Sequence, residues 1–246
     1  MFGSRLRSLS PPAQALVDQA AVIGRPFAES LLLAATDLAA SEAMPALEEL
    51  WERRILCDLP DGHFDFSHAL IGEAAYDALN PVRRRMLHRR AGEALLANVE
   101  ISKQAIDGEA AHHFELANSL DRAILLYGRA AAEAAAVFAL RRAERLYGHA
   151  IRLAGRSNLS GDRLATLYLG RGRVLEHLGE HRAAVAIYQE LGSLARLRHD
   201  LGLECLAIER QATCYAEPTV VHSWSTARPL LERGAMLAAE LNDGDL

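Results

Sequence analysis

The segment Phe64-Asp-Phe-Ser-His68-Ala-Leu-Ile-Gly-Glu73-Ala-Ala-Tyr76 decides the fold, because a strand pattern gives way to a helical pattern within it. Phe64 and Phe66 alternate with polar residues, which is typical of a β-strand, and a helical pattern follows over 68–79. The preceding Ile55-Leu-Cys-Asp-Leu59 has a similar strand character, and Pro60-Asp61-Gly62 between the two is a favourable turn. Residues 55–66 therefore predict a β-hairpin directly before a run of helices.

The stretch before the hairpin predicts a compact group of helices. Ser10-Pro11-Pro12 is a favourable helix start, since serine caps a helix and proline is tolerated in its first turn. Ser41 is the expected cap of another. We expect three helices here, over 8–23, 28–36 and 41–54. Three helices followed by a hairpin outline a winged-helix-like unit, which we place at residues 1–99.

Downstream of a helix expected over 82–98, the sequence from about residue 105 to 246 is helical throughout and repetitive. The pattern Ala-x3-Tyr-x2-Ala/Leu occurs three times, as Ala123/Tyr127/Ala130, Ala143/Tyr147/Ala150 and Ala184/Tyr188/Leu191. The third copy extends to a fuller pattern of large, small and turn residues: Tyr168, Gly172, Leu175, Gly179, Ala184 and Tyr188. That order resembles a tetratricopeptide repeat. A final helix pair is expected over 201–216 and 223–241.

The predicted fold class is mainly α-helical. A winged-helix-like unit with one small β-hairpin is followed, over residues 105–246, by a tetratricopeptide-like α-solenoid. In such a repeat Gly172 and Ala184 let two antiparallel helices approach closely, while the aromatic residues fill the sides. One helix pair cannot bury its own apolar surface, so neighbouring pairs must stack.

Composition narrows the class of protein. The chain has 246 residues, 50% of them hydrophobic, a net charge of −5 and a pI of about 6.1, so bulk charge attracts neither nucleic acid nor an anionic membrane. Lys103 is the only lysine among 27 basic residues, a bias typical of a GC-rich bacterial genome. The three cysteines lack CxxC spacing, and neither a membrane span nor a signal peptide is recognisable. We expect a cytoplasmic protein.

No catalytic or metal-binding motif is recognisable. The lysine at 103 has no glycine-rich loop before it, so a phosphate-binding P-loop is absent. Nucleophile-elbow, zinc-protease and dinucleotide patterns are absent too, and we expect no enzymatic activity. Glu109 and His113 have helical metal-ligand spacing with His112 beside them, but adjacent histidines on a helix point about 100° apart. We therefore expect helix-packing histidines and no metal.

Two charged segments are candidate surfaces. The basic run that contains Arg83, Arg84, Arg85, Arg89 and Arg90 could pair with an acidic partner or another domain, or be a solvated face. The helix expected over 41–54 would be the recognition helix of a DNA-binding winged helix, but it is rich in glutamate. We therefore do not expect nucleic acid to bind.

Three segments together resemble the region after the nucleotide-binding module of STAND-type signalling ATPases, the MalT-like and LuxR-type regulators and their cyclase-linked relatives. They are 9–27, 64–76 and 83–95, and the helical repeats from Ala110 resemble the sensor arm that follows. The resemblance implies that a P-loop module binds ATP, that the winged helix acts as a switch, and that the repeats bind an inducer or partner. It also implies that His68 lies near the nucleotide phosphates, although Ala69 replaces the aspartate that often follows.

The hypothesis from sequence is a non-enzymatic regulatory fragment whose repeats offer a surface for a protein partner or inducer. It binds no cofactor itself; ATP would bind only in a parent protein that carries the P-loop module. One alternative is an allosteric part of an ATP-binding regulator that lends His68 to a separate module. A DNA-binding repressor is a further alternative, disfavoured by its acidic helix. We expect the chain to be the middle of a longer regulator, and an exposed flank of the array predicts self-association.

Overall fold

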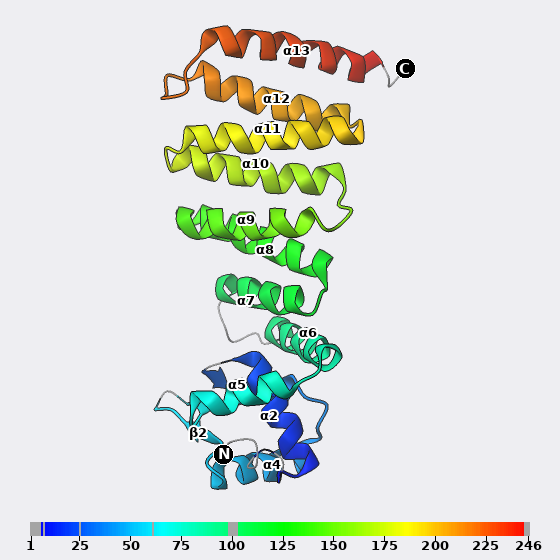
Figure 1. Ribbon diagram of the computed structural model, residues 1–246. Helices are drawn as coiled ribbons and strands as arrows, with labels where there is room; N and C mark the ends of the chain where they lie inside the picture. Colours follow the sequence, from blue (N-terminus) through cyan, green and yellow to red (C-terminus); the bar gives the residue numbers. More distant parts are fainter. Residues whose placement is uncertain (1–5, 7, 25, 61, 98–102, 244–246) are drawn as a thin grey trace. The chain divides into compact units, whose positions relative to one another are not determined.

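The computed structural model describes residues 6, 8–24, 26–60, 62–97 and 103–243 (Figure 1). The chain divides into two compact units, Met1–Ala123 and Ile124–Leu246. This division lies within a helix of the repeats. The boundary predicted between residues 99 and 105 falls mostly on residues 98–102, which lie outside the described residues, and it stays a prediction.

The first unit is built from short helices around a small sheet. Its helices are α2 (Pro11–Ile23), α3 (Glu29–Ala34), α4 (Ala40–Glu52), α5 (Ala69–Ala78), α6 (Pro81–Ala97) and α7 (Lys103–Leu116). Helix α2 contacts α4, α5 and α6, so it lies at the centre of the unit. Ser10 caps α2 as predicted, and its hydroxyl accepts a hydrogen bond from the Ala13 amide at 3.3 Å.

The sheet of this unit has strand order β1-β3-β2 and is antiparallel. Its strands are β1 (Phe27–Ala28), β2 (Leu56–Asp58) and β3 (His63–Phe66). The predicted hairpin is confirmed as β2 and β3, although Asp61 of its turn lies outside the described residues. Strand β1 was not predicted, because two residues are too short to show an alternating pattern.

The start of α4 corrects one prediction. Ala39, not Ser41, is the residue that precedes the helix, and Ser41 lies in its first turn. The Glu42 carboxylate accepts a hydrogen bond from the Ala39 amide at 3.4 Å, which satisfies a donor at the helix start without a serine cap.

The second unit is a stack of antiparallel helices. Its helices are α8 (Leu120–Ala136), which begins in the first unit, α9 (Leu140–Ala154), α10 (Gly161–His177), α11 (His181–Arg198), α12 (Leu201–Ala216) and α13 (Trp224–Asp243). From α9 onward each helix packs against the next in the chain, as Figure 1 shows. The predicted fold class, mainly α-helical with a small sheet followed by a helical solenoid, is confirmed.

A common turn joins several of these helices. One residue adopts a left-handed backbone two positions before the next helix begins: Asn118, Phe138, Gly179 and His199. Glycine and asparagine favour this conformation, whereas a phenylalanine there is strained. Phe138 is nevertheless present, with 77% of its surface exposed.

Within the described ranges, none of the helices combines the length and the apolar character that crossing a bilayer would require.

Candidate functional site

The helices of the second unit interlock through glycines and tyrosines. A methyl group on Gly172 of α10 would lie 2.2 Å from the ring of Tyr188 on α11, so the ring fills the space that a side chain would occupy. Gly170 has the same relation to Tyr147 of α9, at 2.5 Å. The predicted repeat-packing side chains are all buried: Ala123, Tyr127, Ala143, Tyr147, Tyr168, Ala184 and Tyr188.

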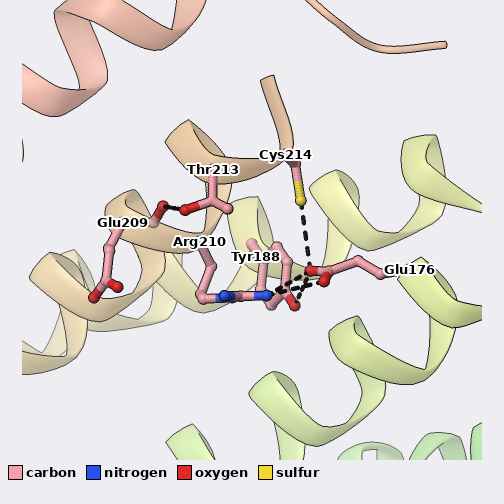
Figure 2. A network of polar contacts seen from close by, with 6 residues as sticks. All are labelled: Glu176, Tyr188, Glu209, Arg210, Thr213 and Cys214. Atoms are coloured by element: carbon pink, nitrogen blue, oxygen red, sulfur yellow. Dashed lines mark hydrogen bonds and ion pairs between the residues drawn. The ribbon is translucent and has the colours of Figure 1, made fainter. Parts of the chain in front are cut away.

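A polar network centred on Glu176 lies at this interlock (Figure 2). The Tyr188 hydroxyl donates a hydrogen bond of 2.6 Å to the Glu176 carboxylate. The Arg210 guanidinium of α12 donates to both carboxylate oxygens at 2.9 Å, and the Cys214 thiol contacts one of them at 3.6 Å. One carboxylate therefore joins α10, α11 and α12.

The surroundings of the network keep the Tyr188 hydroxyl and the Cys214 thiol protonated. Burial and the neighbouring Glu176 carboxylate raise the pKa of Tyr188, so its hydroxyl remains a donor. Burial, again with Glu176, raises the pKa of the Cys214 thiol to about 12. A thiol with so high a pKa is a poor nucleophile. The network therefore holds helices together and has no nucleophile suited to catalysis near neutral pH.

Solvent-exposed charged side chains lie beside the network on α10 and α12. Arg173 lies on α10, three residues before Glu176, and is exposed. Glu209 lies on α12 beside Arg210, and Figure 2 shows its carboxylate turned away from the Glu176 cluster. Helices α10 and α12 also contact each other directly. They form a charged surface, here called the α10/α12 surface, next to the Glu176 network that links the two helices.

A second polar network is buried in the first unit. The His88 ring of α6 lies between two partners, the Tyr76 hydroxyl of α5 and the His113 ring of α7. Both distances are 3.0 Å, to Nε2 and Nδ1 of His88 respectively. Burial, reinforced by neighbouring positive groups, lowers the pKa of His88 to about 4 and that of His113 to about 3. Both rings are therefore neutral at neutral pH.

These contacts explain the pattern of histidines and glutamate that resembled a metal site. His113 faces His88 on another helix, while Glu109 is exposed. Among the described residues no three histidine, cysteine or carboxylate side chains are grouped so that they could hold a metal ion.

The basic run divides into paired and open arginines. Arg83 forms an ion pair of 2.8 Å with the buried Asp18, Arg84 stacks on the Tyr76 ring at 4.4 Å, and Arg90 pairs with Asp37. These three arginines hold the unit together. The other two, Arg85 and Arg89, lie one turn apart on α6, are exposed, and form no ion pair with the described residues.

His68 precedes α5 and is exposed; its carbonyl accepts a hydrogen bond from the Ile71 amide at 2.9 Å, whereas its side chain does not cap the helix. A cleft of about 440 Å³ lies along α5 and is lined by Ala69, Gly72, Glu73, Tyr76 and Asp77, among others, but not by His68. Its two carboxylates would repel phosphate. The predicted nucleotide-proximal role of His68 stays a prediction.

Helix α4 exposes acidic and apolar side chains. Glu42, Glu48 and Glu52 are exposed, and so are Met44 and Trp51, the latter by 60%. Such a helix would be repelled by the phosphates of a DNA duplex.

Sequence reasoning did not identify the two polar networks. The position of Glu176 could have been inferred from its spacing in the sequence. It lies one helical turn after Gly172 and therefore on the helix face that meets Tyr188. No local signal marked the pairing of His88 with His113, since 25 residues separate them.

Comparison with known proteins shows a likeness to a solved structure. No protein-family model and no curated protein matches the chain. Among solved structures the chain is similar to a Signal Transduction ATPase with Numerous Domains (STAND) protein with a tetratricopeptide repeat sensor from Pyrococcus horikoshii. The sequence identity is 13% and the TM-score 0.41, and the match covers 98% of this chain and 46% of that one. The chain thus spans less than half of the length of that protein.

Proposed function

We propose that the chain is a non-enzymatic regulatory module of the cytoplasm, in which tetratricopeptide-like repeats bind a protein partner or inducer and a winged-helix unit acts as a switch. The partner site is the α10/α12 surface. In this reading the parent protein is a STAND-type regulator of the LuxR-like kind, and its nucleotide chemistry resides in a separate P-loop module.

The Glu176 network is the observation that carries the partner site. It joins three successive helices through a single carboxylate, so the neighbouring exposed charges are presented on a rigid backbone. A solenoid whose helices contact mainly their neighbours exposes an extended surface, which suits protein recognition. A prearranged surface also loses less conformational entropy on binding.

The winged-helix part of the proposal is supported by the order of elements in the first unit. Helix α2, strand β1, helices α3 and α4 and strands β2 and β3 follow one another, and the sheet order is β1-β3-β2. The acidic surface of α4 favours a protein contact over DNA. Arg85 and Arg89 of α6 are the arginines we propose for contact with a partner or another domain, because the others are engaged.

The test is affinity capture with matched charge reversals. We expect the purified chain to retain a defined protein that the double variant Arg173→Glu/Glu209→Arg does not retain. The variant Arg182→Glu, which reverses an exposed charge on α11, should retain it. Circular dichroism of each variant controls for folding. Equal capture by all variants would contradict the assigned surface.

Calorimetry with ATP and a separately supplied P-loop module separates this function from the alternative in which the chain lends His68 to a bound nucleotide. We expect the chain to leave the ATP affinity of that module unchanged, with or without Mg²⁺. An increase in ATP affinity that disappears in His68→Ala would instead favour the nucleotide role of that histidine.

A further inference from the structure

A groove lined by arginines lies between α9, α10 and α11 and shares no lining residue with the Glu176 network. Its volume is about 430 Å³. Helix α9 contributes Arg152, α10 contributes Arg171 and Tyr168, and α11 contributes Glu190 and Arg198. Three guanidinium groups from three helices thus border one cleft.

Each of these arginines is positioned by one neighbouring residue, Arg171 through two hydrogen bonds to Glu144, and keeps further donors. Arg171 donates to Glu144 at 2.7 Å, Arg198 donates to a backbone carbonyl at 2.5 Å, and Arg152 contacts the His149 ring at 2.8 Å. A guanidinium carries five N–H donors in a planar fork, so these contacts leave donors for a ligand.

The floor of the groove is polar at one point and apolar elsewhere. The buried Tyr168 donates a hydrogen bond of 2.8 Å to the Glu190 carboxylate. Beside it lie Ile151, Leu164 and Leu194. The glutamate weakens attraction for a phosphate dianion but can accept a hydrogen bond from a peptide N–H. The apolar residues suit an aliphatic side chain.

We propose that this groove binds a peptide segment in which a carboxylate side chain stands beside an apolar side chain. Arg152 and Arg198 hold the carboxylate, the free oxygen of Glu190 accepts a backbone N–H, and the apolar floor receives the neighbouring side chain. The proposal rests on the proposed function in taking this peptide to belong to a protein partner. The groove nevertheless uses residues different from those of the α10/α12 surface.

Gly148 provides a steric test. The atoms nearest to a methyl group built on it belong to the Arg171 guanidinium, at 3.6 Å, which is an ordinary contact. Gly148 and Arg171 both line the groove, so a larger side chain at position 148 meets the guanidinium and competes with a ligand for this space.

The experiment measures binding of synthetic peptides to the full chain by calorimetry or NMR. The probes are acetyl-Leu-Glu-Asp-Leu-amide, its neutral counterpart acetyl-Leu-Gln-Asn-Leu-amide, and inorganic phosphate. We expect the acidic peptide to bind, more weakly as ionic strength rises, and the neutral peptide to bind about tenfold or more weakly.

Variants locate the site. Arg152→Gln/Arg198→Gln and Gly148→Leu should each weaken binding of the acidic peptide by about tenfold or more. Arg173→Gln, on the α10/α12 surface, should leave it unchanged. The exposed arginine variants keep the test valid if the leucine variant misfolds.

Three results would overturn the proposal: no binding of the acidic peptide, equal binding of the neutral peptide, or phosphate bound as tightly as the peptide. If peptide binding fails while partner capture by the α10/α12 surface succeeds, only the groove assignment is wrong. The reverse result would leave the groove in place and remove the α10/α12 surface as the partner site.

Discussion

Acidification should weaken the first unit through its two buried histidines. His88 and His113 are neutral when folded, with pKa values of about 4 and about 3, whereas an unfolded histidine has a pKa of about 6.5. Between these values the unfolded chain binds more protons than the folded chain, so the free energy of unfolding falls as the pH falls. The loss begins near pH 6.5 and is complete below about pH 3.

The magnitude follows from the linkage relation. From pH 7 to pH 5 each histidine should reduce the free energy of unfolding by about 2 kcal/mol, or about 4 kcal/mol for the pair. In His113→Leu one titrating group is gone, so the reduction should halve to about 2 kcal/mol. His177→Gln, which changes an exposed histidine of the second unit, should leave the pH dependence of α6 and α7 unaltered.

Hydrogen exchange of the α6 and α7 amides, corrected for intrinsic rates, measures this stability locally, and NMR titration of the imidazole protons measures the pKa values directly. If both rings titrate near pH 6.5 in the folded protein, the reasoning from burial is refuted. Unchanged α6 and α7 protection at pH 5 would refute it as well.

Three further expectations concern stability and are measured by chemical denaturation. Gly172→Ala should lower the free energy of unfolding by about 1 to 3 kcal/mol, because the added methyl group clashes with the Tyr188 ring. Gly148→Ala should raise it by up to about 1 kcal/mol, because alanine favours a helix more than glycine does. A change of the same sign in both variants would contradict the packing of Tyr188 against Gly172. Phe138→Gly should relieve the left-handed backbone and stabilise by about 0.5 to 1 kcal/mol, and a clear loss would mean that the exposed ring has a packing role. Arg83→Ser leaves the buried Asp18 without its ion pair and should lower the free energy of unfolding by about 1 to 3 kcal/mol. Arg89→Ser should lower it by about 0.5 kcal/mol or less. Equal losses would contradict the distinction between paired and exposed arginines of the basic run.

Local patterns predicted most of the elements. Alternation around Phe64 and Phe66 predicted the hairpin, and Ser10 marked the start of α2, because both signals involve residues adjacent in the chain. The Ser41 cap was wrong because the helix starts earlier, at a residue whose amide is satisfied by a glutamate three positions later.

The sequence by itself determined the helical periodicity, the small residues that permit close packing and the absence of recognisable catalytic motifs, since each of these is written in neighbouring residues. Only the tertiary structure decided which polar side chains meet. Glu176 with Arg210, His88 with His113, and the arginines of the groove come from different helices, and no spacing within one helix encodes their distance. The same holds for the basic run, where the packing of α2 against α6 determines that Arg83 pairs with Asp18, whereas Arg89 is exposed.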